Sequence, residues 1–377
     1  MLTKTEIIDK IDTIDWDFVQ SSTSTTKNSI HPYPAKFIEE IPRAVIDLFP
    51  MDSSFAIFDP FVGSGTTLVT AQDNGYYSYG SDLNPIACLI SRVKTNALEY
   101  SFLNDLNEVI LDSLDDPAKN ITAKVQNKDH WFEMEVQIAL QSLINKIYLI
   151  DNVLNREALL AALSSIIVKV SNQESDTRYA AIEKNVSQKF VYDNFEKAAK
   201  RIFNFMNVDV FKPQTKSEVF NMNSLDISSS MFTKEIGLVI TSPPYPNAYE
   251  YWLYHKFRMS WLGFDPKEVK AEEIGARAHY FKKNHETIND FFNQMYTLFS
   301  KLNSIVIDGG LIVFVIGRSK IHGIEYDNGE LLVEVAEKAG LEFICNKKRI
   351  IQSSRKSFNL NHANIKEETI MFMRAKR

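Results

Sequence analysis

Short apolar runs alternate with longer amphipathic stretches along most of the 377-residue chain. The runs have the length of buried strands, and the stretches between them carry apolar residues at the three-to-four-residue spacing of helices. The predicted strands cover residues 57–59, 76–80, 218–222, 237–241, 311–316, 343–351 and 369–374. The predicted helices cover residues 6–18, 38–49, 68–74, 85–98, 249–263, 287–305 and 329–339. Strands alternating with helices predict a doubly wound α/β sheet.

One connection is far longer than such a sheet needs. About 120 residues separate the helix at 85–98 from the strand at 218–222, where a few residues would suffice. Apolar residues recur there at helical spacing, as in Trp131, Met134 and Ile138, which predicts a small inserted helical bundle. We therefore divide the chain into a first core part (1–98), a mostly helical insertion (99–216) and a second core part (217–377).

Residues 57–67 read IFDPFVGSGTT and form a strand, a glycine-rich turn and the start of a helix. Glycines at such a turn let the backbone approach a cofactor, which then faces the helix N-terminus. The next strand ends at Asp82, where a carboxylate can bind a ribose diol. The turn lacks the third glycine of the dinucleotide fingerprint and the lysine of a P-loop, which argues against NAD and ATP.

The strand at 237–240 is followed by Thr241, Ser242, Pro243, Pro244 and Tyr245. Prolines have no N–H, so their backbone cannot extend a sheet ladder and its carbonyls stay free to accept hydrogen bonds from a ligand. The tyrosine ring can stack on an extruded base, a contact that contributes roughly 1–3 kcal/mol in nucleic-acid sites. This loop therefore suits a flat ring that carries an amino group.

Together, DPFVGSGTT and TSPPY resemble the S-adenosylmethionine-dependent DNA amino-methyltransferases, which methylate the exocyclic nitrogen of cytosine or adenine. HPYPAKF at residues 31–37 resembles the element that closes over the methionine end of the cofactor in that family. The resemblance covers the chain on both sides of the insertion. It implies a Rossmann-like methyltransferase sheet whose last two strands form a C-terminal antiparallel hairpin.

The resemblance also implies roles for individual residues. The cofactor S-adenosylmethionine would be bound by Lys36, Phe37, Asp59, Phe61, Gly63, Gly65, Thr66, Thr67, Asp82, Leu83 and Asn223. The family usually has an acidic residue where Asn223 stands, so Asp226 competes with it for the adenine contact. The catalytic residues would be Ser242, Pro243, Pro244 and Tyr245, with the serine hydroxyl and the Pro243 carbonyl accepting hydrogen bonds from the target amine. Serine at the head of this loop goes mostly with cytosine in the family, and aspartate or asparagine with adenine.

Charge and composition qualify the nucleic-acid prediction. The net charge is −6, whereas a sequence-independent phosphate binder is usually basic. Basic clusters at 277–285 and 347–356 still offer phosphate contacts. The candidate DNA-binding residues are Tyr249, Arg277, Lys347, Lys348, Arg349 and Arg178, and the insertion is the candidate target-recognition region.

The composition also limits location and metal binding. No run reaches the ~18–20 apolar residues of a membrane span. Two cysteines and seven histidines without metal-ligand spacing predict no metal site and a reducing cytoplasm.

These observations predict a site-specific methyltransferase that moves a methyl group from S-adenosylmethionine to N4 of a flipped cytosine in double-stranded DNA. A cognate restriction endonuclease is a candidate partner. One alternative is an N6-adenine DNA or RNA methyltransferase, although no added RNA-binding domain is recognisable. The other is a catalytically degenerate DNA-binding module, which the intact Asp59, Ser242 and Tyr245 argue against.

Overall fold

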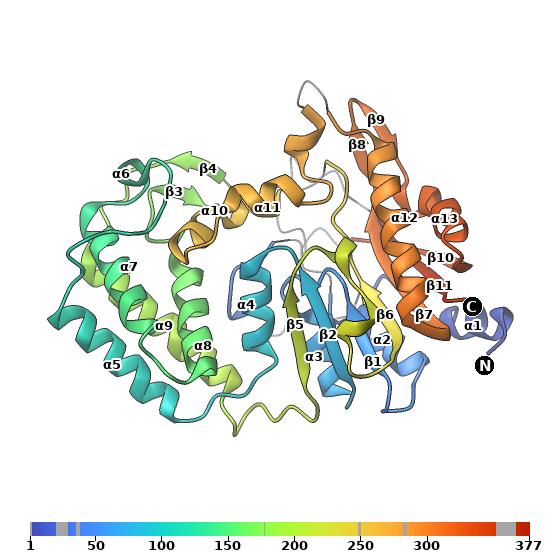
Figure 1. Ribbon diagram of the computed structural model, residues 1–377, viewed down its shortest axis with the longest axis horizontal. Helices are drawn as coiled ribbons and strands as arrows, with labels where there is room; N and C mark the ends of the chain where they lie inside the picture. The colour runs from blue at the N-terminus through green and yellow to red at the C-terminus, as the bar shows by residue number, and fades with distance from the viewer. Residues whose placement is uncertain are drawn as a thin grey trace.

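The computed structural model describes residues 2–19, 29–34, 38–176, 178–247, 250–281, 285–351 and 367–377. Its central element is a seven-stranded sheet with the order β10-β11-β7-β6-β1-β2-β5 (Figure 1). The strands are β1 (Ala56–Asp59), β2 (Tyr77–Asp82), β5 (Ser217–Asn221), β6 (Ile236–Thr241), β7 (Val306–Gly317), β10 (Glu342–Ile350) and β11 (Glu367–Arg374). Only β11 runs antiparallel to its neighbours within this described sheet. The predicted Rossmann-like sheet with its closing hairpin is confirmed.

Helices cover both faces of the sheet because alternate strand residues point to opposite sides. Ala56 and Phe58 join a core with helices α12 and α13, whereas Ile57 joins a core with α1, α2 and α3. These helices and the neighbouring α4 are α1 (Lys4–Ile11), α2 (Glu40–Leu48), α3 (Thr66–Asp73), α4 (Pro85–Lys94), α12 (Ile288–Ile305) and α13 (Asn328–Lys338). Local caps set their starts: Asn84 accepts a hydrogen bond from the N–H of Ile86, with Pro85 at the first turn of α4.

The segment between α4 and β5 is largely helical and lies beside the sheet, at the left of Figure 1. It consists of α5 (Ser101–Asp115), α6 (Lys128–Trp131), α7 (Met134–Ile147), α8 (Val153–Ile166), the hairpin strands β3 (Gln173–Ser175) and β4 (Arg178–Ala181), and α9 (Gln188–Met206). Its apolar core is continuous with α4 and with α10 (Tyr251–Trp261). The division at 99 and 216 stays a prediction, since the insertion shares one core with its neighbours.

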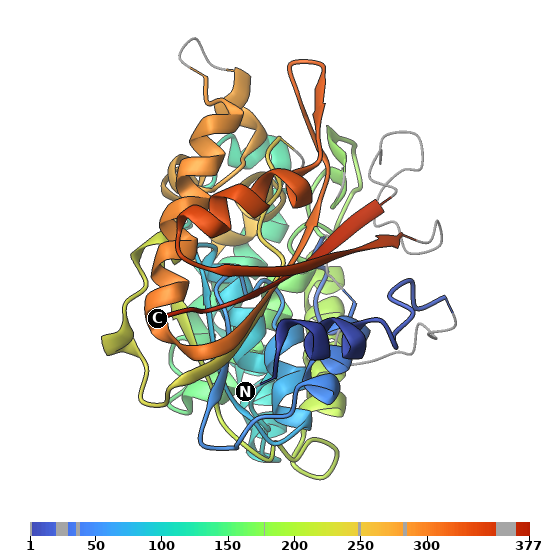
Figure 2. The ribbon, with the colours of Figure 1, turned by 90° about the vertical axis from the view of Figure 1, so that its right-hand side faces the viewer.

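Further short elements connect the longer helices and strands. They are α11 (Pro266–Glu272), the 3-10 turns at Ser224–Asp226, Ser229–Met231 and Arg277–Phe281, and the hairpin β8 (Ser319–Ile321) with β9 (Ile324–Tyr326). The sequence patterns did not predict α11 or the two small hairpins, because each is too short to show a period. In both views the β8–β9 hairpin projects beyond the sheet (Figure 2). Within the described ranges, no helix has the length and apolar character of a membrane span.

Candidate functional site

A cavity opens where the carboxyl ends of β1, β2, β5 and β6 meet α10 and α11. Ligands of doubly wound folds bind at this edge of the sheet. The cavity is lined by Tyr33, Phe61, Val62, Gly63, Ser64, Thr66, Asp82, Leu83, Asn84, Asn223, Ser224, Ser242, Pro244, Tyr251, Val269, Glu272, Glu273 and Ile274. Eight of the predicted site residues are among them, from both the glycine turn and the TSPPY loop.

The glycine turn is held in a backbone conformation that side chains disfavour. Gly63 has φ +48° and Gly65 has φ +81°, both in the left-handed region. The Gly63 N–H donates to Asp82 Oδ2 at 2.9 Å, and its carbonyl accepts from Ser91 Oγ at 2.9 Å. A Cβ atom at Gly63 would lie 3.4 Å from the Tyr33 ring. The turn is therefore fixed against β2 and α4, with Tyr33 above it.

Two aspartates have different places at this edge. Asp82 lines the cavity and accepts from the N–H groups of Gly63 and Asn84, and burial raises its pKa to about 6. Asp59 is fully buried behind the cavity, where its Oδ1 accepts from the Thr241 hydroxyl at 2.6 Å and from the Phe61 N–H at 3.0 Å. Burial raises the pKa of Asp59 to about 6 as well. Asp59 thus ties β1 to β6, and a direct cofactor contact by it remains a prediction.

Other predicted residues also stand behind the lining. Gly65 and Thr67 are not among the lining residues, and the Thr67 hydroxyl donates to the Ile240 carbonyl at 3.2 Å. Pro243 and Tyr245 are likewise outside it, next to the lining residues Ser242 and Pro244. Three predicted residues, Lys36, Phe37 and Tyr249, lie outside the described residues. Their roles stay predictions.

One of the residues that line the cavity, Glu273, is a carboxylate that the sequence did not indicate. Glu273 is 7% exposed, and its two oxygens accept from the N–H groups of Tyr251 at 2.9 Å and Trp252 at 2.7 Å. It therefore caps α10 from the end of α11. Burial raises its pKa to about 8. A single glutamate does not form a recognisable sequence motif. Glu273 contacts a helix that begins 22 positions earlier, so the sequence alone did not reveal its role.

Because the pKa of Glu273 is raised in the folded protein, we expect the stability of the protein to depend on pH. Glutamate titrates near 4.3 in an unfolded chain, whereas Glu273 in the folded protein has a pKa of about 8. The stabilisation from the protonated form is therefore complete below pH ~4.3 and is lost as the pH rises to about 8. We expect the free energy of unfolding of the cofactor-free protein to fall between pH 6 and 8 by up to about 1.4 kcal/mol per pH unit. Glu273→Gln should flatten this fall, as urea unfolding at both pH values would measure. Equal falls in both proteins would contradict it.

The catalytic loop that the sequence predicted is packed on a second glycine. The Asn247 N–H donates to the Gly275 carbonyl at 2.9 Å. Gly275 has φ +73°, and a Cβ atom there would lie 3.0 Å from the Tyr245 carbonyl oxygen. The Tyr245 hydroxyl donates to Glu368 Oε1 at 3.2 Å and lies 3.4 Å from Ser242 Oγ. Contacts from distant segments thus fix the loop.

The basic residues that were predicted to contact DNA lie in different environments. Arg277 is exposed, and exposed Arg178 forms a surface pair with Glu174 at 2.9 Å. Three others have acidic partners: Lys347 pairs with Asp12, Lys348 faces Asp327, Glu330 and Glu367, and Arg349 donates to Glu368 at 2.8 Å. Arg349 has a side chain only 3% exposed because the hairpin register places it opposite Glu368. Arg349 is therefore buried in this structure, and its contact with DNA stays a prediction.

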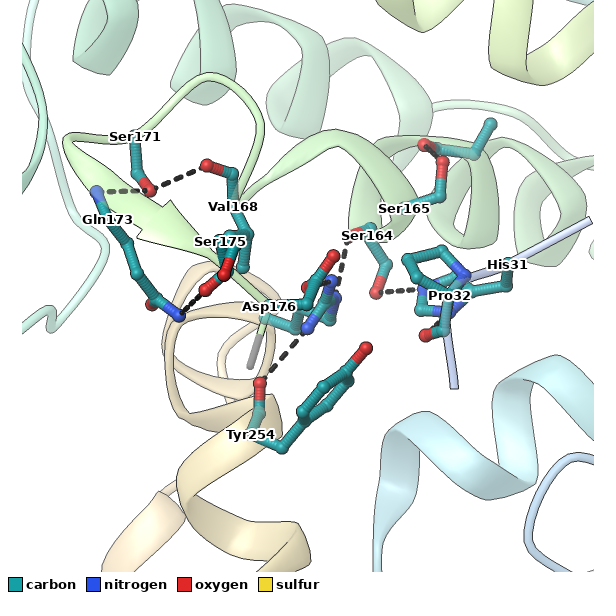
Figure 3. Close-up of polar contacts among 12 residues, drawn as sticks. His31, Pro32, Ser164, Ser165, Val168, Ser171, Gln173, Ser175, Asp176 and Tyr254 are labelled. Carbon is teal, nitrogen blue, oxygen red and sulfur yellow. Dashed lines mark hydrogen bonds and ion pairs between the residues drawn. The ribbon is translucent and has the colours of Figure 1, made fainter. Parts of the chain in front are cut away.

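A buried arginine joins the insertion to the second core part. Arg258 on α10 is fully buried and donates to the Ser164 carbonyl at 3.1 Å and the Tyr254 carbonyl at 3.0 Å, and it pairs with Asp176. On the other side of Ser164, the hydroxyl lies 3.0 Å from His31 Nε2 (Figure 3). Arg258 and Ser164 therefore mark the point where four parts of the chain meet: the segment around His31, α8, the β3–β4 hairpin and α10.

Replacing this arginine should destabilise the fold. Arg258→Met keeps much of the side-chain volume but leaves the Asp176 carboxylate without its partner. We expect a loss of about 3 kcal/mol, the lower end for breaking a buried pair, because Asp176 is 31% exposed. Urea unfolding measures it, with Arg178→Met as the matched control; its exposed pair should contribute less than about 1 kcal/mol. Equal losses in the two variants would contradict this assignment.

The sequence is similar to those of known DNA methylases and type II methyltransferases. Residues 4–92 match the model of the DNA methylase family N6_N4_Mtase. The chain is 29% identical to the type II methyltransferase M.MvaI of Kocuria varians over 291 residues, covering 68% of this chain and 62% of that protein. It is 23% identical to M.BsoBI of Geobacillus stearothermophilus over 308 residues, covering 70% and 58%. The chain thus spans about three-fifths of the length of these relatives.

Two further similarities are more limited. A 106-residue stretch is 37% identical to M.MjaII of Methanocaldococcus jannaschii, covering 27% of this chain and 19% of that protein. Among solved structures, the rRNA methyltransferase AviRa of Streptomyces viridochromogenes aligns with a TM-score of 0.35 at 10% identity, covering 99% of this chain and 95% of that one. The N-methyltransferase NodS of Bradyrhizobium japonicum aligns with a TM-score of 0.23 at 10% identity, covering 49% and 69%.

The family match and the type II relatives imply S-adenosylmethionine as the cofactor. The residues present fit this molecule. Gly63 leaves open the space that a side chain would take beneath Tyr33, and the Asp82 carboxylate stands where a ribose diol binds in doubly wound folds.

Proposed function

We propose that this protein is a site-specific DNA methyltransferase that methylates N4 of a cytosine flipped out of duplex DNA. The observation that carries the proposal is that Ser242, from the TSPPY loop, lines the same cavity as Gly63 and Asp82. The group that would hold the target amine therefore shares one chamber with the groups that would hold the cofactor. The similarity to type II methyltransferases supports DNA as the substrate.

When bound, S-adenosylmethionine supplies a methyl group activated by a positively charged sulfur. The glycine turn at Gly63 would take the methionine end, and Asp82 would accept hydrogen bonds from the ribose hydroxyls. Asn223 lines the cavity and Asp226 does not, which favours Asn223 for the adenine end. Tyr33 covers the turn, so that water is displaced when the cofactor is in place.

The target amine is a poor nucleophile because its lone pair is delocalised into the ring. Acceptors for both N–H groups make the nitrogen pyramidal and direct its lone pair toward the methyl group. We assign the first acceptor to the Ser242 hydroxyl and the second to the Pro243 carbonyl. Serine at the head of this loop is also the reason to favour cytosine over adenine, because serine there goes mostly with cytosine in the family that the motifs resemble.

The DNA is proposed to lie along the carboxyl edge of the sheet, between the β3–β4 and β8–β9 hairpins that flank α10 and α11 (Figure 1). On the first hairpin, Arg178 is exposed and Tyr179 is 40% exposed, with Lys256 of α10 bonded to the Tyr179 hydroxyl. A cation beside an aromatic ring suits contacts to a phosphate and a base. We assign target recognition to residues 99–216 and keep a cognate endonuclease as a proposed partner.

The test is transfer of a tritiated methyl group from S-adenosylmethionine to nucleic acid. Duplex DNA of mixed sequence, single-stranded DNA and structured RNA are compared at equal nucleotide concentration. Labelling of duplex DNA at a defined sequence is expected, with little label in RNA. Preferential labelling of RNA would favour the alternative RNA methyltransferase. Binding of DNA without labelling of any substrate would favour the degenerate DNA-binding module.

A further inference from the structure

A continuous line of polar groups leads from the catalytic loop into the closing hairpin of the sheet. Ser242 Oγ lies 3.4 Å from the Tyr245 hydroxyl, which donates to Glu368 Oε1 at 3.2 Å. The other Glu368 oxygen accepts from Arg349 at 2.8 Å. These residues come from the loop after β6, from β11 and from β10. None of the sequence motifs links all four residues, and the proposed function so far uses only Ser242.

The far end of this line is nearly sealed from water. The side chains of Arg349 and Glu368 are 3% and 14% exposed, and the two residues are directly paired across the antiparallel hairpin. Burial raises the pKa of Glu368, while Arg349 and the Tyr245 hydroxyl act in the opposite direction. Among the described residues, the charged and titratable groups that interact with Glu368 are Arg349, Tyr245 and Tyr251, whose pKa Glu368 helps to raise. A buried carboxylate beside an arginine can remain ionised and ready to accept a proton.

We propose that Ser242, Tyr245 and Glu368 form a proton path that takes the proton released by the target amine, with Arg349 holding Glu368 ionised. The inference rests on the proposed function, because the amine must bind at Ser242. Glu368 acts through Tyr245, so it is a positioning and proton-accepting residue that does not touch the substrate. The 3.4 Å separation is long for a proton step, and such contacts shorten when substrate is bound.

The step balances in atoms and charge. The amine lone pair forms the new N–C bond as the C–S bond breaks, and its electron pair stays on sulfur, which becomes a neutral thioether. The amine proton passes to Ser242 Oγ while the serine hydroxyl proton moves to the Tyr245 oxygen. The tyrosine proton moves to Glu368, which becomes a neutral carboxylic acid. One positive and one negative charge disappear together, and Glu368 later returns its proton to water through its exposed 14%.

The test compares Tyr245→Phe and Glu368→Gln in single-turnover methylation of duplex DNA across a pH range, with S-adenosylmethionine saturating. Both variants should react about 10²-fold more slowly, within the usual range for proton-transfer catalysis. The wild-type rate should fall as the pH drops through the pKa of Glu368, and this acidic limb should be absent in Glu368→Gln. The double variant should be no slower than either single one, because both changes break one path. Cofactor affinity measured by calorimetry should be unchanged.

The matched control is Glu342→Gln, which removes a carboxylate paired with Arg374 across the same hairpin at 2.5 Å. It should keep the wild-type rate and pH profile. Glu368→Gln leaves Arg349 buried without a counter-charge and can fail to fold; Tyr245→Phe then decides, since it leaves that ion pair intact. A folded Tyr245→Phe protein with the wild-type rate and pH profile would overturn the path alone. A wild-type protein that methylates no DNA would overturn the proposed function and the path with it.

Discussion

Ser242→Ala is expected to slow methyl transfer by about 10²–10³-fold, the loss seen when one well-placed hydrogen-bonding group is removed from an active site. The hydroxyl faces the cavity at the end of β6, where it would accept from the target amine. Without it the amine keeps its planar, unreactive form. Single-turnover methylation at saturating cofactor measures the effect, because it separates the chemical step from product release.

The same variant should bind the cofactor as the wild type does, because Ser242 is assigned to the target and not to the methyl donor. Calorimetric titration with S-adenosylmethionine checks this. Ser319→Ala is the control for the loss of a buried hydroxyl: it removes a hydrogen bond to Asn328 at 3.1 Å without touching the cavity. A folded Ser242→Ala protein that fails to bind cofactor would contradict the division of roles.

Gly63→Val is expected to abolish cofactor binding at concentrations that saturate the wild type. A β-branched residue is strongly disfavoured at φ +48°, and its side chain would occupy the space between the turn and the Tyr33 ring. Calorimetric titration measures the loss. Gly323→Val is the matched control, since Gly323 also has a positive φ, +85°, but nothing lies within 4 Å of its Cβ position. Cofactor binding by a folded Gly63→Val protein would show that the turn does not hold the cofactor.

The sequence predicted the parts of the fold that local patterns encode. The strand ending at Thr241 is an apolar run, and the turn at Gly63 needs a residue without a side chain. The packing of α12 follows from its apolar spacing and its Thr287–Asp290 capping box. Such features depend on residues close together in the chain, so local sequence patterns are enough to predict them.

The remaining features depend on partners that are distant in sequence. Glu273 becomes part of the site by capping a helix that begins before it, and Arg258 becomes buried through contacts with the insertion. Arg349 stands in a basic cluster that indicates a DNA contact, yet the hairpin places it opposite Glu368. The positions of basic residues along the sequence do not reveal which of them pair with an acidic residue on a neighbouring strand. The proton path through Glu368 therefore becomes visible only in three dimensions.

The central claim is best tested by identifying the methylated base. Duplex DNA is incubated with the protein and S-adenosylmethionine, digested to nucleosides and analysed by mass spectrometry. A cofactor-only incubation and the Ser242→Ala protein serve as controls. We expect N4-methylcytosine, formed by the wild-type protein and nearly absent with Ser242→Ala. N6-methyladenine without N4-methylcytosine would contradict it.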